Sequence, residues 1–566
     1  MPYRAPLDAF DALLAATDAR RLAETVRFAE ATPETLRAVA AEAARLCEDV
    51  LAPLNRVGDR HPAHLDADGV ARTPPGFAEG YGAIRDGGWC GVSADPAHGG
   101  LGLPQTAWTL VNEMMCSACL SLSICPLLTN GAIEALEAHA PEAIKALYLP
   151  KLVSGAWTGV MCLTEPQAGT DVGAARTRAT PKGDGTWALE GQKIYISWGD
   201  HDCAGNVVHL VLARAAGAPE GSRGLSLFLT PKFLPTADGA PGDRNAVRCI
   251  GMEDKLGLHG SPTCVMAYEG ATAWLIGEEG RGLAAMFTFM NNARLGVGVQ
   301  GIGVAEAALQ QAVAYAHERR QGRTPVGDGT GPIAEHADVR RMLLSMQGKV
   351  MAARAIALAC AVAGDMAKAT GAADWAARWA FLTPIAKAFG TDVGCEVASE
   401  AIQVHGGMGY IEETGVAQHL RDVRVAAIYE GTNGVQAMDL VGRKLADGGA
   451  AARALLDEIA ETARAFADGP DAPPAERLEA ARAALTGATE WMLAAAPNDR
   501  AAGAAPYLRA WALTLGAHLL LRAGGAEPRL APLARVVCAR MLPAVSALAA
   551  ESAAGAQALY AADLAS

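Results

Sequence analysis

The chain has little positive charge and few aromatic side chains. Lys and Arg total 48 against 61 Asp and Glu, which gives the 566 residues a formal net charge of −13, and only 5% of the residues are aromatic. An acidic chain is a poor non-specific binder of nucleic acid, because the phosphates of nucleic acid attract basic surfaces. Residues 447–566 contain no lysine at all. We therefore expect no nucleic-acid partner.

The chain also lacks the cysteine patterns of a disulfide framework or a zinc site. Its 12 cysteines show no repeating spacing, which is typical of reduced thiols in a cytosolic protein. Cys116 and Cys119 form a Cys-x-x-Cys pair, but no second pair or nearby His pair completes a metal site. We expect small buried residues here, no bound metal and a cytoplasmic location.

Neither a signal peptide nor a membrane span is visible in the sequence. Residues 1–6 lack the apolar core of a signal peptide. The most apolar run, around Val350–Ala363, is short and is interrupted by Arg354, so we expect no integral membrane segment. A chain of 566 residues is nevertheless long enough for several domains with large cores.

Hydrophobic patterning predicts an α+β, multidomain chain. Residues 1–155 have a helical pattern, with one helix ending near Pro53. The helical segments are Leu36–Leu54, Leu110–Met115 and Ala132–Tyr148. Residues 156–275 contain short β-prone segments separated by Gly, Pro and Asp, which predicts a sandwich or small barrel. These segments are Val160–Leu163, Trp187–Leu189, Lys193–Ser197, Val207–Leu212, Leu225–Leu229, Ala246–Ile250 and Cys264–Tyr268.

Long helices return after the β-prone part. Residues 276–448 are expected to form a helical bundle. Its segments are Leu283–Arg294, Val304–Arg320, Val339–Met366, Trp375–Ala401 and Val435–Leu445. Residues 449–566 are rich in Ala and Leu and predict an appended helical domain with a structural or interface role. A loop is expected inside this domain at Pro470, Pro473 and Pro474.

One glycine-rich stretch imitates a nucleotide-binding motif. Gly296, Gly298 and Gly301 match the spacing of the dinucleotide fingerprint. That fingerprint follows a β-strand, whereas Met286–Arg294 has a helical pattern. We expect these glycines to let two helices pack closely.

Five short stretches combine glycine with polar side chains that a ligand can contact. They are Cys162–Asp171, Gly191–Gly199, Arg319–Arg323, Gln403–Tyr410 and Ile428–Gly434. Taken singly, the first two are explained by a capped turn and a strand end. The third fits phosphate recognition and a helix C-terminus equally well. In the fourth, the glycine pair permits close approach to a phosphate, and His405 is expected to be a packed histidine.

The fifth stretch contains a carboxylate next to glycine. Glu430 follows the mostly apolar run Val423–Ala427 and precedes Gly431, while Thr432 or Asn433 can cap the next helix. Burial raises the pKa of a carboxyl group and makes it a usable base near neutral pH. By itself, however, the stretch is better explained as a capped joint between a loop and a helix.

In order and spacing, the five stretches together resemble the acyl-CoA dehydrogenases over residues 30–448. The resemblance implies that family's fold: an N-terminal α-helical domain, a middle β-barrel or sandwich and a C-terminal four-helix bundle. Tyr3–Leu7 and the additional C-terminal helical domain resemble the subgroup that includes 3-methylmercaptopropionyl-CoA dehydrogenase and some longer-chain acyl-CoA dehydrogenases.

The resemblance also implies FAD as cofactor, held where the β domain meets the bundle, and assigns residues to it. The residues matched to FAD contacts are Met161, Leu163, Thr164, Tyr195, Ser197 and Thr432, together with Arg319, Gln403, Gly406 and Gly407, which would reach the FAD of a neighbouring subunit. Thr170, Arg294 and Gly431 are matched to the substrate side.

Glu430 matches the family's catalytic base, and three positions depart from the family pattern. Some members carry the base on the helix of Arg294, at the position that Ala293 holds here, so Glu430 has no rival. Met161 stands where other members have an aromatic or another residue, and Gly322 replaces a common Phe.

The implied reaction is α,β-dehydrogenation of an acyl-CoA to the trans-2-enoyl-CoA, as in fatty-acid β-oxidation. Glu430 takes the α-proton and the flavin takes the β-hydride. The backbone N–H of Glu430 and a flavin hydroxyl stabilise the enolate charge. Expected substrates are 3-methylmercaptopropionyl-CoA or a fatty acyl-CoA, and electrons pass to an electron-transfer flavoprotein. The alternatives are an acyl-CoA oxidase and, against the acidic charge, a DNA-associated member without dehydrogenase activity. We expect a homodimer, because the appended domain can cover the surface through which other members pair dimers.

Overall fold

The computed structural model describes residues 3–326 and 329–564, which packing divides into two units. The barrel unit comprises Ala43–Trp108 and Ala118–Ala293, and the helical unit comprises Met1–Glu42, Thr109–Ser117 and Arg294–Ser566. These units group segments by packing rather than by chain order. The four domain boundaries expected from the sequence therefore stay a prediction.

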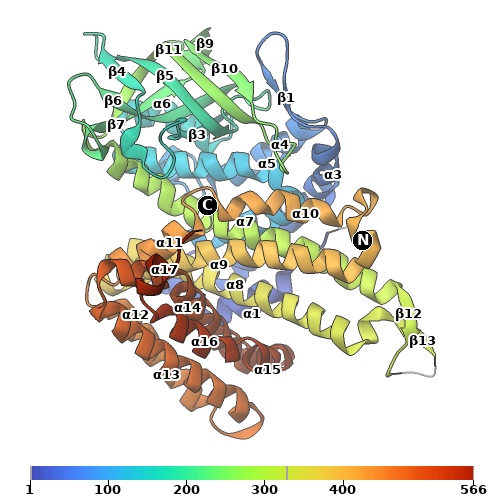
Figure 1. Cartoon of the computed structure of the whole chain (residues 1–566). Helices are drawn as coiled ribbons and strands as arrows, with labels where there is room; N and C mark the ends of the chain where they lie inside the picture. The colour runs from blue at the N-terminus through green and yellow to red at the C-terminus, as the bar shows by residue number, and fades with distance from the viewer. Residues whose placement is uncertain (1–2, 327–328, 565–566) are drawn as a thin grey trace. The chain divides into compact units, whose positions relative to one another are not determined.

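The β-prone segments close into a barrel, drawn in green in Figure 1. The strands are β3 (Trp157–Cys162), β4 (Arg178–Pro181), β5 (Trp187–Ser197), β6 (Asn206–Ala215), β7 (Leu225–Pro231), β10 (Val247–Met252) and β11 (Thr263–Ile276). Hydrogen bonds link β11, β5, β4, β6 and β7 in a ring, because β7 pairs with both β6 and β11. β3 and β10 extend the sheet beyond this ring. The predicted barrel is thus confirmed, and β3 and β10 remain as the edge strands of the sheet.

The core of the barrel unit joins sheet and helices. β7 is buried throughout and β6 almost throughout, as expected of strands covered on both faces. The buried cluster runs from Leu136 through Tyr148 and Trp157 to Leu227 and Phe289. Besides the barrel strands, this unit contains the helices and short strands η2 (Leu46–Leu51), α3 (Ala52–Arg60), β1 (His64–Leu65), β2 (Ala71–Arg72), α4 (Phe77–Asp86), α6 (Glu142–Val153), β8 (Phe233–Pro235) and β9 (Pro241–Arg244).

The helical unit contains the predicted bundle. Its main helices are α7 (Gly282–Glu318), α8 (Ala337–Thr370), α9 (Ala373–His405), α10 (Val416–Val423) and α11 (Asn433–Asp439). α7 belongs to this unit from Arg294 onward. A Cβ added at Gly301 would lie 2.2 Å from the carbonyl oxygen of Gly390, and one at Gly298 would lie 2.6 Å from that of Ala386. α7 and α9 therefore touch backbone to backbone, which confirms the packing interpretation of the glycine stretch.

The last part of the chain is helical, as predicted. It consists of α12 (Ala450–Ala465), α13 (Ala472–Ala494), α14 (Pro497–Ala526), α15 (Ala531–Arg540), α16 (Pro543–Ser552) and α17 (Gln557–Ala561). α14 packs on α8, α9, α11 and the N-terminal α1 (Leu7–Ala16). Figure 1 shows these appended helices in orange and red. The appended helices are thus part of the same core as the bundle.

Three helix boundaries differ from the sequence-based expectations. The helix expected to end near Pro53 continues from α2 (Pro33–Arg45) through the π-helical turn η2 to Arg60, because Pro53 lies in the first turn of α3, after that wider turn. The single helix expected over Ala132–Tyr148 is broken at Ala140, next to Pro141. Pro473 and Pro474 open α13 instead of forming a loop, since the first turn of a helix tolerates proline.

The expectation that no segment is long and apolar enough to span a membrane was wrong. Two described helices meet that criterion by length and composition, α5 (Gln105–His139) and α8, and their apolar windows are 100% and 89% buried within the protein. Arg354 does not interrupt α8, because its guanidinium is buried and paired with Glu113 and Glu306 at 2.6 Å. Core packing thus accounts for the apolar character of both helices.

All twelve cysteines are free thiols, and all except the half-buried Cys395 are buried. Cys116 and Cys119 lie inside α5, where Cys119 has non-helical angles and marks a kink. The expectation of small buried residues at this pair is therefore confirmed.

Candidate active site

Glu430 lies on a short loop between the 3-10 turn η10 (Arg424–Ala427) and α11. Its φ is +55° and that of Gly431 is +81°, so two successive residues have left-handed backbone. This conformation is unfavourable for a glutamate by roughly 1–2 kcal/mol and needs support from its surroundings. The side chain of Thr432 caps α11 by accepting a hydrogen bond from the Val435 N–H at 3.2 Å, so the capped joint predicted from the sequence is present.

Side chains from α9 and α11 hold both carbonyls of this loop. The Nζ of Lys387 donates to the Gly431 carbonyl at 2.9 Å and to the Asn433 side-chain oxygen at 3.0 Å. The Nε2 of Gln436 donates to the Glu430 carbonyl at 3.2 Å and to the Gly431 carbonyl at 3.3 Å. In residues 3–326 and 329–564, no protein acceptor takes the backbone N–H of Glu430.

The electrostatic setting of Glu430 is that of a base. Burial raises the pKa of its carboxyl to about 7, against the opposing charges of Lys387 and Arg294. Burial also lowers the pKa of Lys387 to about 8, although Glu430 and Asp392 favour its charged form. A carboxyl group that titrates near neutrality can accept a proton efficiently at working pH. The predicted shift from burial is therefore present.

Arg294 belongs to the same surroundings through α7. Its Nη1 lies 3.2 Å from Asp439 Oδ2 in α11, and Arg443 donates to the other oxygen of Asp439 at 2.5 Å. Arg294 is buried. The structure thus brings Glu430, Gly431, Thr432 and Arg294 into one neighbourhood.

A second set of predicted residues lies at the C-terminal end of α9. Arg319 follows the last turn of α7, and Gln403, Gly406 and Gly407 occupy the end of α9 and the turn after it. The stacked rings of Tyr315 and His405, with centroids 4.2 Å apart, join these two helix ends. His405 also bonds the Ala401 carbonyl, so it is packed as expected.

The distance along α9 separates this second set from Glu430. Lys387 and Gln403 are 16 residues apart on one helix, which at 1.5 Å per residue is about 24 Å. Gly406 has a φ of +60°, and a Cβ at Gly406 or Gly407 would meet open space. These glycines are therefore free of packing demands and can present backbone to a ligand.

In the barrel unit, a buried ion pair ties the first two motifs together. Lys193 in β5 donates to Glu165 Oε1 and to the Leu163 carbonyl, both at 2.8 Å. The Ile194 N–H bonds the Thr164 carbonyl at 3.0 Å. Burial raises the pKa of Glu165, but Lys193 and other donors outweigh it and bring the pKa to about 2. Leu163 and Thr164 are thus held rigidly beside β5.

Tyr195 is presented to solvent by a β-bulge. The register of β5 against β11 shifts between Lys193 and Ile196, and Tyr195 takes a φ of +59°. Bulges of this kind redirect side chains near functional sites, and Tyr195 is 61% exposed. Ser197 ends the same strand and is half-buried.

The remaining predicted residues of this unit lie on β3 and the turn after it. Met161 is half-buried in β3, opposite Leu210 of β6. Thr170 is exposed on the turn that follows Ala168. Their roles as ligand contacts stay predictions.

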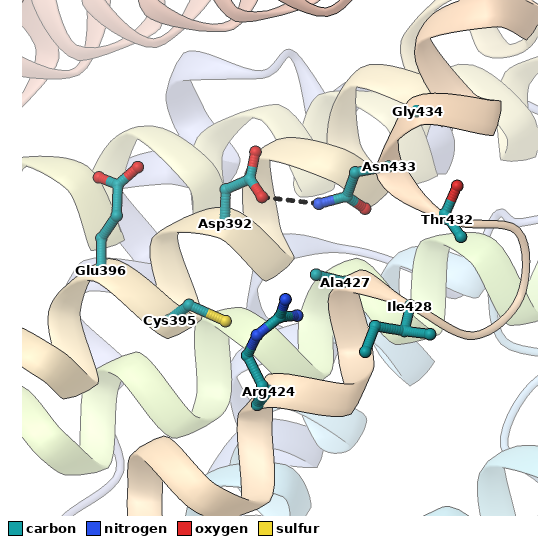
Figure 2. Close-up of a pocket in the computed structure, with 9 residues that line it drawn as sticks. All are labelled: Asp392, Cys395, Glu396, Arg424, Ala427, Ile428, Thr432, Asn433 and Gly434. Carbon is teal, nitrogen blue, oxygen red and sulfur yellow. Dashed lines mark hydrogen bonds between the residues drawn. The ribbon is translucent and has the colours of Figure 1, made fainter. Parts of the chain in front are cut away.

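A cavity of about 560 Å³ opens beside the Glu430 loop in the helical unit. It is lined by Asp392, Cys395, Glu396, Arg424, Ala427, Ile428, Thr432, Asn433 and Gly434. Figure 2 shows Arg424 between Cys395 and Ala427, and the hydrogen bond from Asn433 to Asp392, 2.7 Å long. The predicted FAD residue Thr432 is part of its wall, and its volume suits part of a small molecule.

Sequence reasoning missed the residues that support this geometry. Lys387 and Gln436 hold the Glu430 loop, Asp439 binds Arg294, and Lys193 pairs with Glu165. Lys387 lies in an otherwise apolar stretch of helix, Pro384–Phe389. A lone lysine at a buried helical position is the feature that could have identified it, because buried lysines need partners.

Comparison with known families identifies the class of protein. Residues 33–156, 160–271 and 280–446 match the N-terminal, middle and C-terminal domains of acyl-CoA dehydrogenases. The chain belongs to the acyl-CoA dehydrogenase family, and it is an enzyme of that class. Among its relatives is the 3-methylmercaptopropionyl-CoA dehydrogenase of Ruegeria pomeroyi, 45% identical over 516 residues, which cover 89% of this chain and 88% of that protein.

Two solved structures are similar to this chain in fold. ACDH-11 of Caenorhabditis elegans, in complex with C11-CoA, matches 94% of this chain and 90% of its own with a TM-score of 0.79 and 20% identity, which shows the shared fold including the appended helices. A chain in the structure described as the electron transferring flavoprotein of Acidaminococcus fermentans is 28% identical, with a TM-score of 0.60, and covers 72% of this chain and 96% of that one.

Proposed function

We propose that this acyl-CoA dehydrogenase uses FAD and that Glu430 removes the α-proton of the acyl-CoA thioester. The observation that carries the proposal is the pKa of about 7 of Glu430, on a loop fixed in a left-handed conformation. A carboxylate that is poised near neutrality and rigidly held is suited to take a weakly acidic proton next to a carbonyl.

The residues present fit FAD in each unit. In the barrel unit, Tyr195 offers an exposed aromatic face, and Ser197 offers a hydroxyl at the end of the same strand. In the helical unit, Thr432 lines a cavity, and Gly406 and Gly407 leave open space at their Cα atoms. When bound, FAD supplies the two-electron acceptor for the hydride that leaves the β-carbon.

The chain's own groups do the rest of the chemistry. Glu430 accepts the α-proton at its carboxylate, and its backbone N–H is available to the thioester oxygen, where negative charge develops. The backbone at Glu430 and Gly431 is fixed in advance by Lys387 and Gln436, so these groups need little reorganisation.

The test is Glu430→Gln with substrate added to the FAD-loaded enzyme without an electron acceptor. We expect the variant to bind FAD but to lose substrate-dependent bleaching of the flavin at 450 nm by at least roughly 10³-fold, since a general base is removed. Glu458→Gln, on α12 and paired with Arg378 away from the loop, is the matched control and should bleach normally. Normal bleaching in Glu430→Gln would refute the assignment of the base.

We further propose 3-methylmercaptopropionyl-CoA as the substrate, with a fatty acyl-CoA as the competing choice. The support is the name of the 45% identical relative, which matches nearly the whole chain. Bleaching rates for a panel that contains 3-methylmercaptopropionyl-CoA and linear acyl-CoAs of different chain length decide between them. A higher kcat/KM for every linear acyl-CoA would exclude the sulfur-containing substrate as the preferred one.

We propose an electron-transfer flavoprotein as the acceptor and a homodimer as the assembly, in the cytoplasm. The flavoprotein is named by one structural relative at 28% identity. We expect turnover coupled to such a flavoprotein with little peroxide formed in air, whereas stoichiometric peroxide would identify an oxidase.

The dimer is supported by the second residue set, which lies about 24 Å along α9 from the Glu430 loop and so suits a different cofactor molecule. Light scattering that gives a tetramer would contradict it.

A further inference from the structure

We propose that Lys387 is a positioning residue for the base: together with Gln436 it clamps the two carbonyls of the left-handed Glu430–Gly431 segment. The inference rests on the proposed function of Glu430. Lys387 and Gln436 are both fully buried, and neither belongs to the loop that they hold. Buried lysine is unfavourable unless its ammonium group is satisfied by partners.

In the clamp, one side-chain donor binds the Glu430 carbonyl and another binds the Gly431 carbonyl. Gln436 Nε2 bonds the Glu430 carbonyl at 3.2 Å, and Lys387 Nζ bonds the Gly431 carbonyl at 2.9 Å. Each peptide plane that flanks the Gly431 Cα is therefore fixed by a side chain from a helix. Since the plane before Gly431 also sets the direction of the Glu430 backbone, the clamp controls where the carboxylate points.

Besides the Gly431 carbonyl, Lys387 Nζ binds Asn433, which is itself held by α9. Asn433 accepts from Lys387 Nζ at 3.0 Å and donates to Asp392, Thr391 and the Ala388 carbonyl. Lys387 thus ties the loop to α9 through a short network rather than through one contact. Low local dielectric strengthens such charge-assisted hydrogen bonds.

The position of Lys387 is set by the packing of α7. A Cβ at Gly298 would come within 3.1 Å of the Lys387 Cα and 2.6 Å of the Ala386 oxygen. The two helices therefore touch at the very turn that carries the lysine. This backbone contact fixes the reach of the side chain to the loop.

Charge gives Lys387 a second effect on the base. The charged groups that act on the Glu430 carboxyl are Lys387 of α9 and Arg294 of α7, and both lower its pKa against burial. Those that act on Lys387 are Glu430, Asp392 and Arg294. Arg294 is largely engaged by Asp439, which Arg443 also binds. Removal of the ammonium charge should therefore raise the pKa of Glu430 further.

The experiment compares Lys387→Met and Lys387→Arg with the FAD-loaded wild type. For Lys387→Met we expect kcat to fall roughly 10- to 100-fold, as for loss of one charge-assisted hydrogen bond, with little change in KM. The acid limb of the kcat/KM profile should also move to higher pH. Lys387→Arg retains the charge and should keep the wild-type limb while its rate falls through the altered reach. Lys368→Met, which removes an exposed lysine from the last turn of α8, is the matched control and should leave both readouts unchanged.

The outcomes separate this inference from the function on which it rests. Wild-type kcat and an unmoved acid limb in Lys387→Met would overturn the clamp while Glu430→Gln still tests the base independently. In Lys387→Met, a lower kcat with an unmoved acid limb and an equal loss in FAD binding would assign Lys387 to folding alone. That result would also overturn the positioning role. If Lys387→Met does not fold, Gln436→Leu is expected to lower kcat with the acid limb unmoved, and normal kcat there would refute the clamp.

Discussion

The pKa of Glu430 makes a quantitative prediction about the pH dependence of the reaction. Only the deprotonated carboxylate can accept the α-proton, and the profile of kcat/KM reports ionisations of the free enzyme. Burial raises the pKa of this carboxyl to about 7. We therefore expect kcat/KM to rise with pH through neutrality and to level off above pH 8.

The size of the rise follows from the fraction of deprotonated base. With a pKa of about 7, roughly one eleventh of the enzyme carries the carboxylate at pH 6 and roughly ten elevenths at pH 8, so the ratio of kcat/KM is about 10. A carboxyl at its ordinary pKa of 4.5 would be almost fully deprotonated at both pH values, and the ratio would be about 1. The two cases are therefore well separated.

The assay is the initial rate of flavin bleaching in stopped flow, with acyl-CoA well below KM. It should be recorded from pH 5.5 to 9 at constant ionic strength, with an acyl group that does not titrate. A flat profile over this range, in an enzyme whose bleaching requires Glu430, would refute the conclusion that burial tunes this base. A midpoint near 7 that moves upward in Lys387→Met would support both the base and its neighbour.

Two further predictions concern the framework. Lys193→Met leaves Glu165 buried without its cation, so we expect a loss of roughly 3–5 kcal/mol in the free energy of unfolding and weaker FAD binding; unchanged denaturation and FAD content would show that the pair has no structural role. Gly301→Ala places a Cβ 2.2 Å from the Gly390 oxygen, so it should lower the free energy of unfolding by roughly 1–3 kcal/mol, as measured by thermal melting. Gly487→Ala lies at an exposed position of α13 where a Cβ meets open space, so in the same measurement it should be neutral or stabilising.

The sequence was informative about Glu430 because its neighbours in the chain explain its chemistry. An apolar run precedes it, glycine follows it, and Thr432 caps the next helix. These local features predict a buried carboxylate on a joint, and the resemblance identifies its substrate class. The barrel was predictable for a similar reason, since each strand carries its own β-prone pattern.

What the sequence did not reveal depends on contacts between distant segments. Lys387 lies 43 residues before Glu430 in the chain, and no local pattern indicates that its ammonium group reaches Gly431. The positive φ of Tyr195 follows from a register shift against β11, which involves residues far along the chain. The buried Arg354 looked like an interruption of an apolar helix, because its partners Glu113 and Glu306 come from other helices. Non-local pairing of this kind needs the fold.

The glycine stretch of α7 links a local sequence pattern to the long-range contact of Lys387 with the Glu430 loop. Its spacing matches a nucleotide fingerprint, yet Gly298 and Gly301 contact the backbone of α9 at Ala386 and Gly390. Lys387 follows Ala386 directly, so the close approach that glycine permits sets the depth at which the lysine emerges toward the Glu430 loop. A larger residue at Gly298 would have to push α9 away by the width of a methyl group. Such a shift exceeds the few tenths of an ångström by which a 2.9 Å hydrogen bond to Gly431 can lengthen. Glycine in this stretch therefore serves helix packing, and through Lys387 it supports the loop of the proposed base.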